Sequence, residues 1–265
     1  MIERLPIGLE VAYDEAGSGI PLLFIHGWPH NRTLWAGQLS GLATQARCIA
    51  PDLRGFGGTT VAGPWSIDRF ADDLAALLDG LEVERAVVCG LSMGGYVALA
   101  MLRRHRARLR ALILTSTRAT ADSAESREKR MRLIEFVEEH GVEALAGRQL
   151  KAMVGATTFE SRPLVREALL RMMAAAPQDG VVGALRAMAD RPDATLLLPT
   201  IGVPTLVVGG AEDGFTPPEE LRAMAAQIPH SRFELIAGAG HACAYELPAA
   251  FNHVVSEFLS GLRFN

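Results

Sequence analysis

The fold of this chain is decided by one glycine-rich stretch, Gly90-Leu91-Ser92-Met93-Gly94-Gly95. An apolar run at residues 86–89 precedes this stretch and predicts a buried strand, and a helical pattern begins at Tyr96. The stretch therefore matches G-x-S-x-G at a sharp turn from strand to helix, where side chains at Gly90 and Gly94 would clash. Such a turn exposes the serine hydroxyl, so we predict that Ser92 is a nucleophile. The alternative is a glycine-rich turn that holds a buried serine.

Short apolar runs alternate with helical patterns on both sides of this turn. That alternation predicts an α/β fold with a mostly parallel central sheet and helices on both faces. We expect strands at residues 8–13, 22–25, 46–50, 86–89, 109–114, 205–208 and 232–236. We expect helices at residues 34–42, 67–81, 94–104, 218–226 and 248–262.

The alternation stops between residues 120 and 198, where helical patterns occur without a strand pattern. We predict a core of residues 1–119 and 199–265 and an inserted helical cap of residues 120–198. Several methionines fall in this insertion, Met153 and Met173 among them. Methionine adapts to irregular apolar shapes, so these side chains are interpreted first as filler of the apolar core, and those that face the triad as candidates for an adaptable apolar wall.

A serine nucleophile needs a base, and in an elbow of this kind the chain order is serine, then acid, then histidine. His241 is the predicted base, because it ends the small-residue loop Gly238-Ala239-Gly240 directly after a predicted strand. The alternative for His241 is an ordinary surface histidine. The other downstream histidines lie in helices, in the insertion or before a strand: His105, His140, His230 and His253.

The acid that orients the base is expected after the strand at residues 205–208. Glu212 and Asp213 both occur there, and Asp213 is preferred because it precedes Gly214 at the tip of the turn. Glu212 is interpreted as a solvated neighbour. The other acid position, after the strand at residues 109–114, contains no carboxylate.

Acyl transfer also needs donors for the negative oxygen that develops in the transition state. We predict the backbone N–H groups of Met93, which follows the nucleophile, and of Trp28, in the loop after an early strand. His26 is expected to pin that loop. Pro29 interrupts any helix between His26 and His30, so no zinc-type pair and no metal site are predicted.

These motifs together resemble the α/β-hydrolase fold superfamily over the whole chain, including the cap. The resemblance is closest to the esterase and lactonase branch, which includes proteins like 3-oxoadipate enol-lactonase and carboxylesterases. It implies a Ser92, Asp213 and His241 triad and no metal or organic cofactor. Ser92 separates the chain from haloalkane dehalogenases and epoxide hydrolases, which have aspartate at this position. The resemblance rests on three segments and two residues: residues 26–29, 51–57 and 90–95 with Asp213 and His241.

Two further residues are predicted to contact substrate. Phe215 follows the predicted acid, and Arg118 lies just past a strand end near the start of the insertion. Arg118 has two interpretations: it binds a substrate carboxylate, or it pairs with a carboxylate of the cap.

Composition limits the partners. The chain has 265 residues and a net charge of −4, which disfavours a general nucleic-acid binder. The basic run at residues 103–110 is interpreted as a helix end, where cations suit the helix dipole. Three cysteines without a CxxC pair favour a reducing cytoplasm. No targeting or membrane-spanning segment is expected, and hence no membrane partner. The predicted triad implies a small-molecule ester or lactone as the partner.

The sequence thus predicts a serine hydrolase of small carboxylic esters or lactones that acts through an acyl-enzyme. Two alternatives remain open. A cofactor-free perhydrolase, similar to haloperoxidases, would use the same residues with peroxide in place of water. A hydrolase-fold ligand sensor would bind in the pocket with little turnover.

Overall fold

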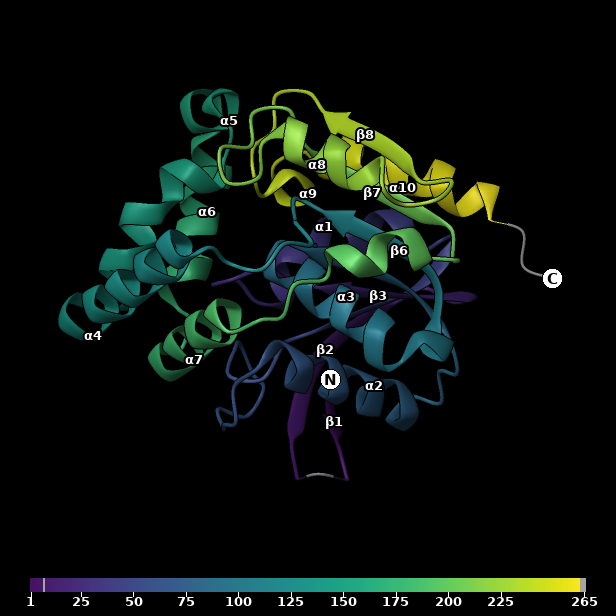
Figure 1. Cartoon of the computed structure of the whole chain (residues 1–265), viewed down its shortest axis with the longest axis horizontal. Helices are drawn as coiled ribbons and strands as arrows, with labels where there is room; N and C mark the ends of the chain where they lie inside the picture. Colours follow the sequence, from purple (N-terminus) through teal and green to yellow (C-terminus); the bar gives the residue numbers. More distant parts are fainter. Residues whose placement is uncertain (7, 263–265) are drawn as a thin grey trace.

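A sheet of eight strands lies at the centre of the computed structural model (Figure 1), which describes residues 1–6 and 8–262. The strand order is β1-β2-β4-β3-β5-β6-β7-β8. The β1–β2 and β2–β4 pairs are antiparallel, and all other neighbours in the sheet are parallel. The strands are β1 (Ile2–Arg4), β2 (Glu10–Ala16), β3 (Ile20–Ile25), β4 (Ala46–Pro51), β5 (Ala86–Leu91), β6 (Leu109–Thr115), β7 (Thr205–Gly210) and β8 (Arg232–Ile236).

The apolar runs of the sequence become the inner strands. Every residue of β5 and β7 is buried, which is expected of parallel strands covered on both faces. The strand expected at residues 8–13 instead occupies Glu10–Ala16, because its polar second half pairs with β4. The three-residue strand β1 was not predicted, since it has no apolar run and forms only by pairing with β2.

Helices cover both faces of the sheet, as predicted. α2 packs on α3, and α1 packs on α10. The helix expected at residues 34–42 starts with a 3₁₀ turn at Arg32–Trp35, and the short helix α9 was missed. The helices of this layer are α1 (Ala36–Leu42), α2 (Ile67–Gly80), α3 (Met93–Arg104), α8 (Pro218–Ala225), α9 (Cys243–Glu246) and α10 (Pro248–Gly261).

The segment between β6 and β7 is helical and stands to one side of the sheet (Figure 1, left). Gly141, with φ of +80°, kinks its longest helix. The division of the chain into a cap of residues 120–198 and a core remains a prediction. The predicted core includes residues 263–265, which lie outside the described residues. The helices are α4 (Ala124–Met153), α5 (Ala156–Ser161), α6 (Pro163–Ala174) and α7 (Gln178–Ala189).

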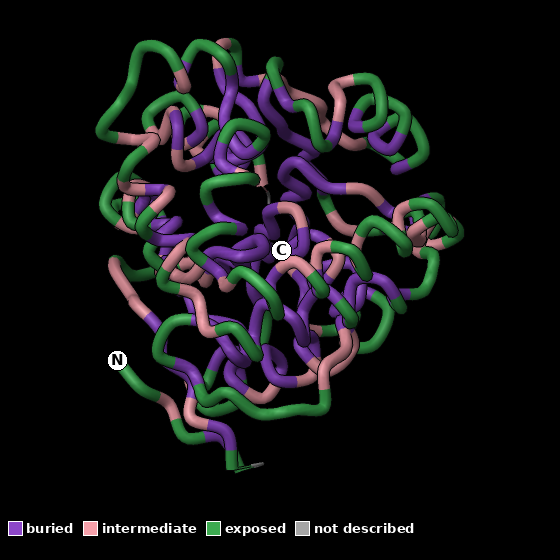
Figure 2. The backbone as a smooth tube through the Cα atoms, turned by 90° about the vertical axis from the view of Figure 1, so that its left-hand side faces the viewer, coloured by how far each residue is buried: buried purple, intermediate pink, exposed green. Residues whose placement is uncertain are grey.

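The buried residues lie mainly in the interior of the molecule. Figure 2 shows buried backbone concentrated inside the molecule, with exposed segments around its periphery. The basic run lies on the outside, where Arg104 pairs with Asp72 of α2 at 2.8 Å and Arg108 pairs with Asp79. Among the described residues, no helix combines the length and the apolar composition that crossing a bilayer requires.

Candidate active site

Ser92 occupies the turn between β5 and α3 in a backbone conformation that L-residues rarely adopt. Its φ is +54° and its ψ is −113°. A Cβ at Gly90 would lie 2.2 Å from the Gly94 carbonyl oxygen, and one at Gly94 would lie 2.2 Å from that of Ile25. Only glycine therefore fits at either position. The Ser92 N–H donates to Thr115 O at 2.9 Å, which fixes the turn against β6.

His241 and Asp213 form a buried pair. His241 Nδ1 lies 3.0 Å from Asp213 Oδ2 and 3.1 Å from Oδ1. Asp213 Oδ1 also accepts from the N–H groups of Phe215 and Thr216, each at 2.9 Å. Burial opposes ionisation of Asp213, but the His241 ring and these N–H groups together lower the pKa of Asp213 below its usual value. Because Asp213 accepts at Nδ1, the Nε2 atom of His241 is left with the free lone pair.

Ser92 and His241 line one cavity of about 480 Å³, which we call the Ser92 cavity. Ser92 is partly exposed there, so the alternative of a buried serine does not hold. No hydrogen bond joins Ser92 Oγ to His241 within residues 1–6 and 8–262, and such bonds often tighten only when substrate binds. The cavity is lined by Trp28, Ser92, Tyr96, Arg118, Asp122, Ser126, Lys129, Arg130, Arg132, Leu133, Arg148, Gln149, Met153, Met188, Phe215, Thr216 and His241.

The two predicted oxyanion donors flank Ser92. Met93 is the first residue of α3, so its N–H has no acceptor one turn earlier in the helix. The loop that carries Trp28 approaches the turn closely, since a Cβ on Gly27 would lie 3.3 Å from Ser92 Cβ. Among the described residues, the Trp28 backbone N–H has no hydrogen-bond acceptor, while its indole N–H donates to Val181 O of α7 at 3.1 Å. Both N–H groups are therefore free to bind a ligand oxygen.

His26 has the structural role expected of it. Its Nε2 accepts from Leu53 N–H at 2.9 Å, and its Nδ1 lies 2.8 Å from Gly27 O. His30 is buried as well, and burial lowers the pKa of its ring to about 3. His30 is therefore neutral at physiological pH and does not repel a protonated His241.

Glu212 is exposed, as the sequence suggested, and it also binds a neighbouring helix. Its carboxylate accepts from the N–H of Thr157 at 3.0 Å and from the hydroxyl of Thr157 at 2.7 Å. These bonds lower the pKa of Glu212 and tie the loop of Asp213 to helix α5. Glu212 thus points away from His241 toward the helical segment.

Glu246 makes a similar tie from the interior and was missed by the sequence analysis. One carboxylate oxygen accepts from Gly240 N–H, next to His241, and the other accepts from Gly155 N–H, each at 2.9 Å. Burial raises the pKa of Glu246. No sequence signal marks this residue, because both of its partners are backbone N–H groups and one of them, Gly155, lies 91 residues away along the chain. Glu246 therefore holds the loop of His241 against the start of α5.

Replacing Glu246 with glutamine is expected to lower the free energy of unfolding by about 1–3 kcal/mol. The glutamine amide has one acceptor oxygen where the carboxylate has two, so one of the two buried N–H groups loses its partner. Urea unfolding followed by circular dichroism measures this change. Glu257→Gln is the control, since Glu257 pairs with Arg232 on the surface. An unfolding midpoint equal to that of the original protein would show that the two N–H groups do not depend on Glu246.

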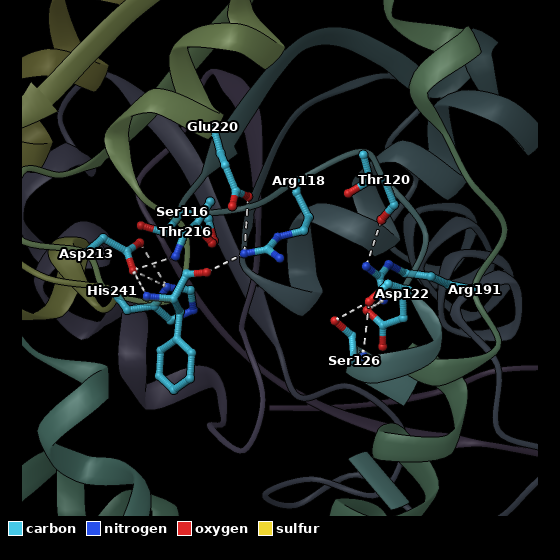
Figure 3. Close-up of polar contacts among 12 residues, drawn as sticks. Ser116, Arg118, Thr120, Asp122, Ser126, Arg191, Asp213, Thr216, Glu220 and His241 are labelled. Carbon is cyan, nitrogen blue, oxygen red and sulfur yellow. Dashed lines mark hydrogen bonds and ion pairs between the residues drawn. The ribbon is translucent and has the colours of Figure 1, made fainter. Parts of the chain in front are cut away.

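The two predicted substrate contacts both line the Ser92 cavity. The Phe215 ring packs edge-on against the His241 ring with centroids 5.1 Å apart. Arg118 does not pair with a carboxylate of the helical segment, as one interpretation held; it pairs with Glu220 of α8 at 3.3 Å and donates to Phe215 O. Figure 3 shows Arg118 between the Asp213–His241 pair and the cluster around Asp122. The structure therefore corrects the partner of Arg118 and keeps it beside the site.

Comparisons with known proteins agree with this geometry. The sequence model of the alpha/beta hydrolase fold family matches residues 20–246. The structure of a thermophilic esterase from Thermogutta terrifontis with malate bound is 41% identical, with a TM-score of 0.94 over 98% of this chain and 97% of that chain. The 3-oxoadipate enol-lactonase 2 of Acinetobacter baylyi is 30% identical over 92% of this chain and 89% of its own length. A putative non-heme bromoperoxidase of Mycobacterium tuberculosis is 30% identical over 96% of this chain and 99% of its own length.

Proposed function

The chain belongs to the α/β hydrolase fold family, and from this premise we propose that it is a serine hydrolase of small carboxylic esters or lactones. One observation carries the proposal: Ser92, on its strained turn, shares a cavity with a histidine whose Nδ1 is held by a buried carboxylate. The similarity to an esterase and to an enol-lactonase supports esters and lactones as the substrate class.

In the proposed mechanism, Ser92 Oγ attacks the carbonyl carbon while His241 Nε2 takes its proton. The N–H groups of Trp28 and Met93 bind the carbonyl oxygen as it becomes negative. His241 then returns the proton to the leaving alkoxide as the ester C–O bond breaks, which leaves an acyl-Ser92. In a lactone the alkoxide stays attached to the acyl group.

The acyl group leaves by the same steps with water as the nucleophile. His241 takes a proton from water, the hydroxide oxygen bonds to the acyl carbon, and Ser92 regains its proton as the acid is released. Asp213 stabilises the protonated ring of His241. Its lowered pKa keeps Asp213 ionised at neutral pH, as this role requires.

A second candidate is a perhydrolase, favoured by the similarity to a putative non-heme bromoperoxidase. Hydrogen peroxide would replace water in deacylation and yield a peracid. Initial rates on short alkyl esters, aryl esters and lactones, measured with and without peroxide, distinguish the two reactions. We expect repeated turnover without peroxide. Turnover that needs peroxide would favour the perhydrolase, and one stoichiometric acylation without turnover would favour a ligand sensor.

Met153 is expected to limit the length of the acyl chain. It lines the Ser92 cavity, whereas Met173, also proposed for this wall, is buried in α6 and is not among the lining residues. Met153→Phe should lower kcat/KM for octanoyl relative to acetyl esters by about tenfold, because misfit of a methylene in an apolar pocket costs roughly this much. Met173→Leu is the control. A uniform change over all acyl lengths would contradict a role in length selection.

A further inference from the structure

The Ser92 cavity is strongly basic. Asp122 is the one acidic side chain among its described lining residues. The whole chain carries a net charge of −4, so this local excess of cations opposes the overall balance. The basic lining residues are Arg118, Lys129, Arg130, Arg132 and Arg148.

Part of this charge is held by buried ion pairs at the wall and directly behind it, since Arg191 contacts the lining residue Asp122 without lining the cavity itself. The buried carboxylate of Asp122 is shared by two arginines, Arg130 and Arg191, and the Arg191 contact measures 2.6 Å. The Asp122 and Arg191 side chains are only 4% and 3% exposed. Two guanidinium groups against one carboxylate leave a net positive charge where water screens it poorly.

The remaining cations are weakly compensated. Lys129 and Arg132 pair with Glu125 and Glu128 one helical turn away, and all four side chains are more than half exposed. Such exposed pairs contribute little and exchange readily for a better anion. Arg148 stacks on the Phe136 ring at 4.9 Å.

Within the part of the chain that the structure describes, no carboxylate lies within ion-pair distance of Arg148. The five cations of the lining and Arg191 carry six positive charges. Their ion-pair partners carry four negative charges, so these ten groups together have a net charge of +2. The four partners are Asp122, Glu125, Glu128 and Glu220. Solvation of a helix surface does not by itself explain why this excess of positive charge lines the same cavity as Ser92.

We propose that the substrate is an anionic ester or lactone, one that carries a second, ionised carboxylate, and that the cations of α4 bind this carboxylate, with Arg148 as its main partner. This inference rests on the proposed function, since it names the substrate class of the same site. Arg148 offers a planar pair of N–H donors, held by its stacking on Phe136, that matches a carboxylate. Hydrolysis of such an ester then releases a dicarboxylate and an alcohol.

A matched pair of substrates tests this inference. The 4-nitrophenyl monoester of adipic acid and 4-nitrophenyl hexanoate share their leaving group and the length of their acyl chain, and differ in a terminal carboxylate. We expect kcat/KM to be about tenfold higher for the adipate monoester, mainly through a lower KM, because a charge-assisted hydrogen bond contributes this much. High salt should reduce the ratio.

The variants Arg148→Ala, Arg148→Glu and Arg132→Glu assign the effect to α4. We expect the ratio of the two kcat/KM values to fall toward one in Arg148→Ala and below one in Arg148→Glu. Arg171→Ala is the control, since Arg171 lies on the exposed side of α6 and should keep the original ratio. The salt dependence of the original protein remains informative if a variant does not fold.

Failure of this inference is distinct from failure of the proposed function. Turnover of hexanoate with a ratio of one or less would overturn the anionic substrate and leave the hydrolase intact. A high ratio that persists in both Arg148 variants and in Arg132→Glu would overturn the assignment to α4. Turnover of neither ester, nor of any ester or lactone, would overturn the hydrolase itself.

Discussion

Replacing Ser92 with alanine is expected to lower kcat for ester hydrolysis by about 10⁴-fold or more, because no other group replaces the attacking oxygen. The fold should persist. The Ser92 side chain makes no capping bond to α3, and the turn is held by backbone bonds to Thr115 and by glycines that the variant keeps. Alanine also carries the same Cβ, so the strain at φ of +54° is unchanged.

Ser116→Ala is a matched control for this experiment. Ser116 also has a positive φ, +45°, and follows β6 as Ser92 follows β5, but it does not line the Ser92 cavity. Within the described part of the chain, the one hydrogen-bond partner of its hydroxyl is Cys243 Sγ, at 3.9 Å. Turnover on one activated ester and circular dichroism should be measured for both variants. A folded Ser92→Ala protein that keeps near-normal turnover would remove Ser92 as the nucleophile.

The sequence predicted the turn at Ser92 well, because its cause is local. Steric exclusion at Gly90 and Gly94 acts within a few residues, so a short pattern records it. The parallel strands were equally visible, since burial on both faces demands unbroken apolar runs. The pairing of Asp213 with His241 followed from chain order and from the position of each residue after a strand.

Features that depend on distant partners were missed or misassigned. Strand β1 exists only through its pairing with β2, and Glu246 accepts from the N–H of Gly155, 91 residues away. Arg118 was placed near the site correctly, but its partner Glu220 lies about a hundred residues further along the chain. A local sequence pattern does not predict such contacts.

The basic character of the Ser92 cavity was hidden for the same reason. Arg118, Arg130 and Arg148 are separated by a dozen or more residues and are interspersed with acidic residues, of which only Asp122 belongs to the described lining of the cavity. The helical insertion therefore suggested an apolar wall of methionines. Residues on both sides of the kink at Gly141 line the cavity that contains Ser92. Residues far apart in α4 then contribute charge to one surface.

The second large loss of kcat is expected when the acid, Asp213, is replaced. Asp213→Asn should lower kcat by about 10⁴-fold, because asparagine cannot stabilise the protonated ring of His241. Asp213 Oδ1 already accepts two backbone N–H bonds, so the asparagine oxygen would remain there and its NH₂ group would face His241 Nδ1. Nδ1 would then have to accept, and the proton would move to Nε2, which is the atom that must act as base.

Glu212→Gln is the matched control, one residue away and of the same charge. Its carboxylate binds Thr157 rather than His241, so its loss removes a tie to α5 and leaves the tautomer of His241 unchanged. We expect Glu212→Gln to lower kcat by less than about tenfold, the scale of one hydrogen bond. Kinetics of both variants on one activated ester, with unfolding curves for each, decide between the two acids. If Glu212→Gln lowered kcat more than Asp213→Asn, the orienting role would belong to Glu212. The loop of residues 210–214 would then have to rearrange when substrate binds, because Asp213 lies beside His241 Nδ1 in this structure.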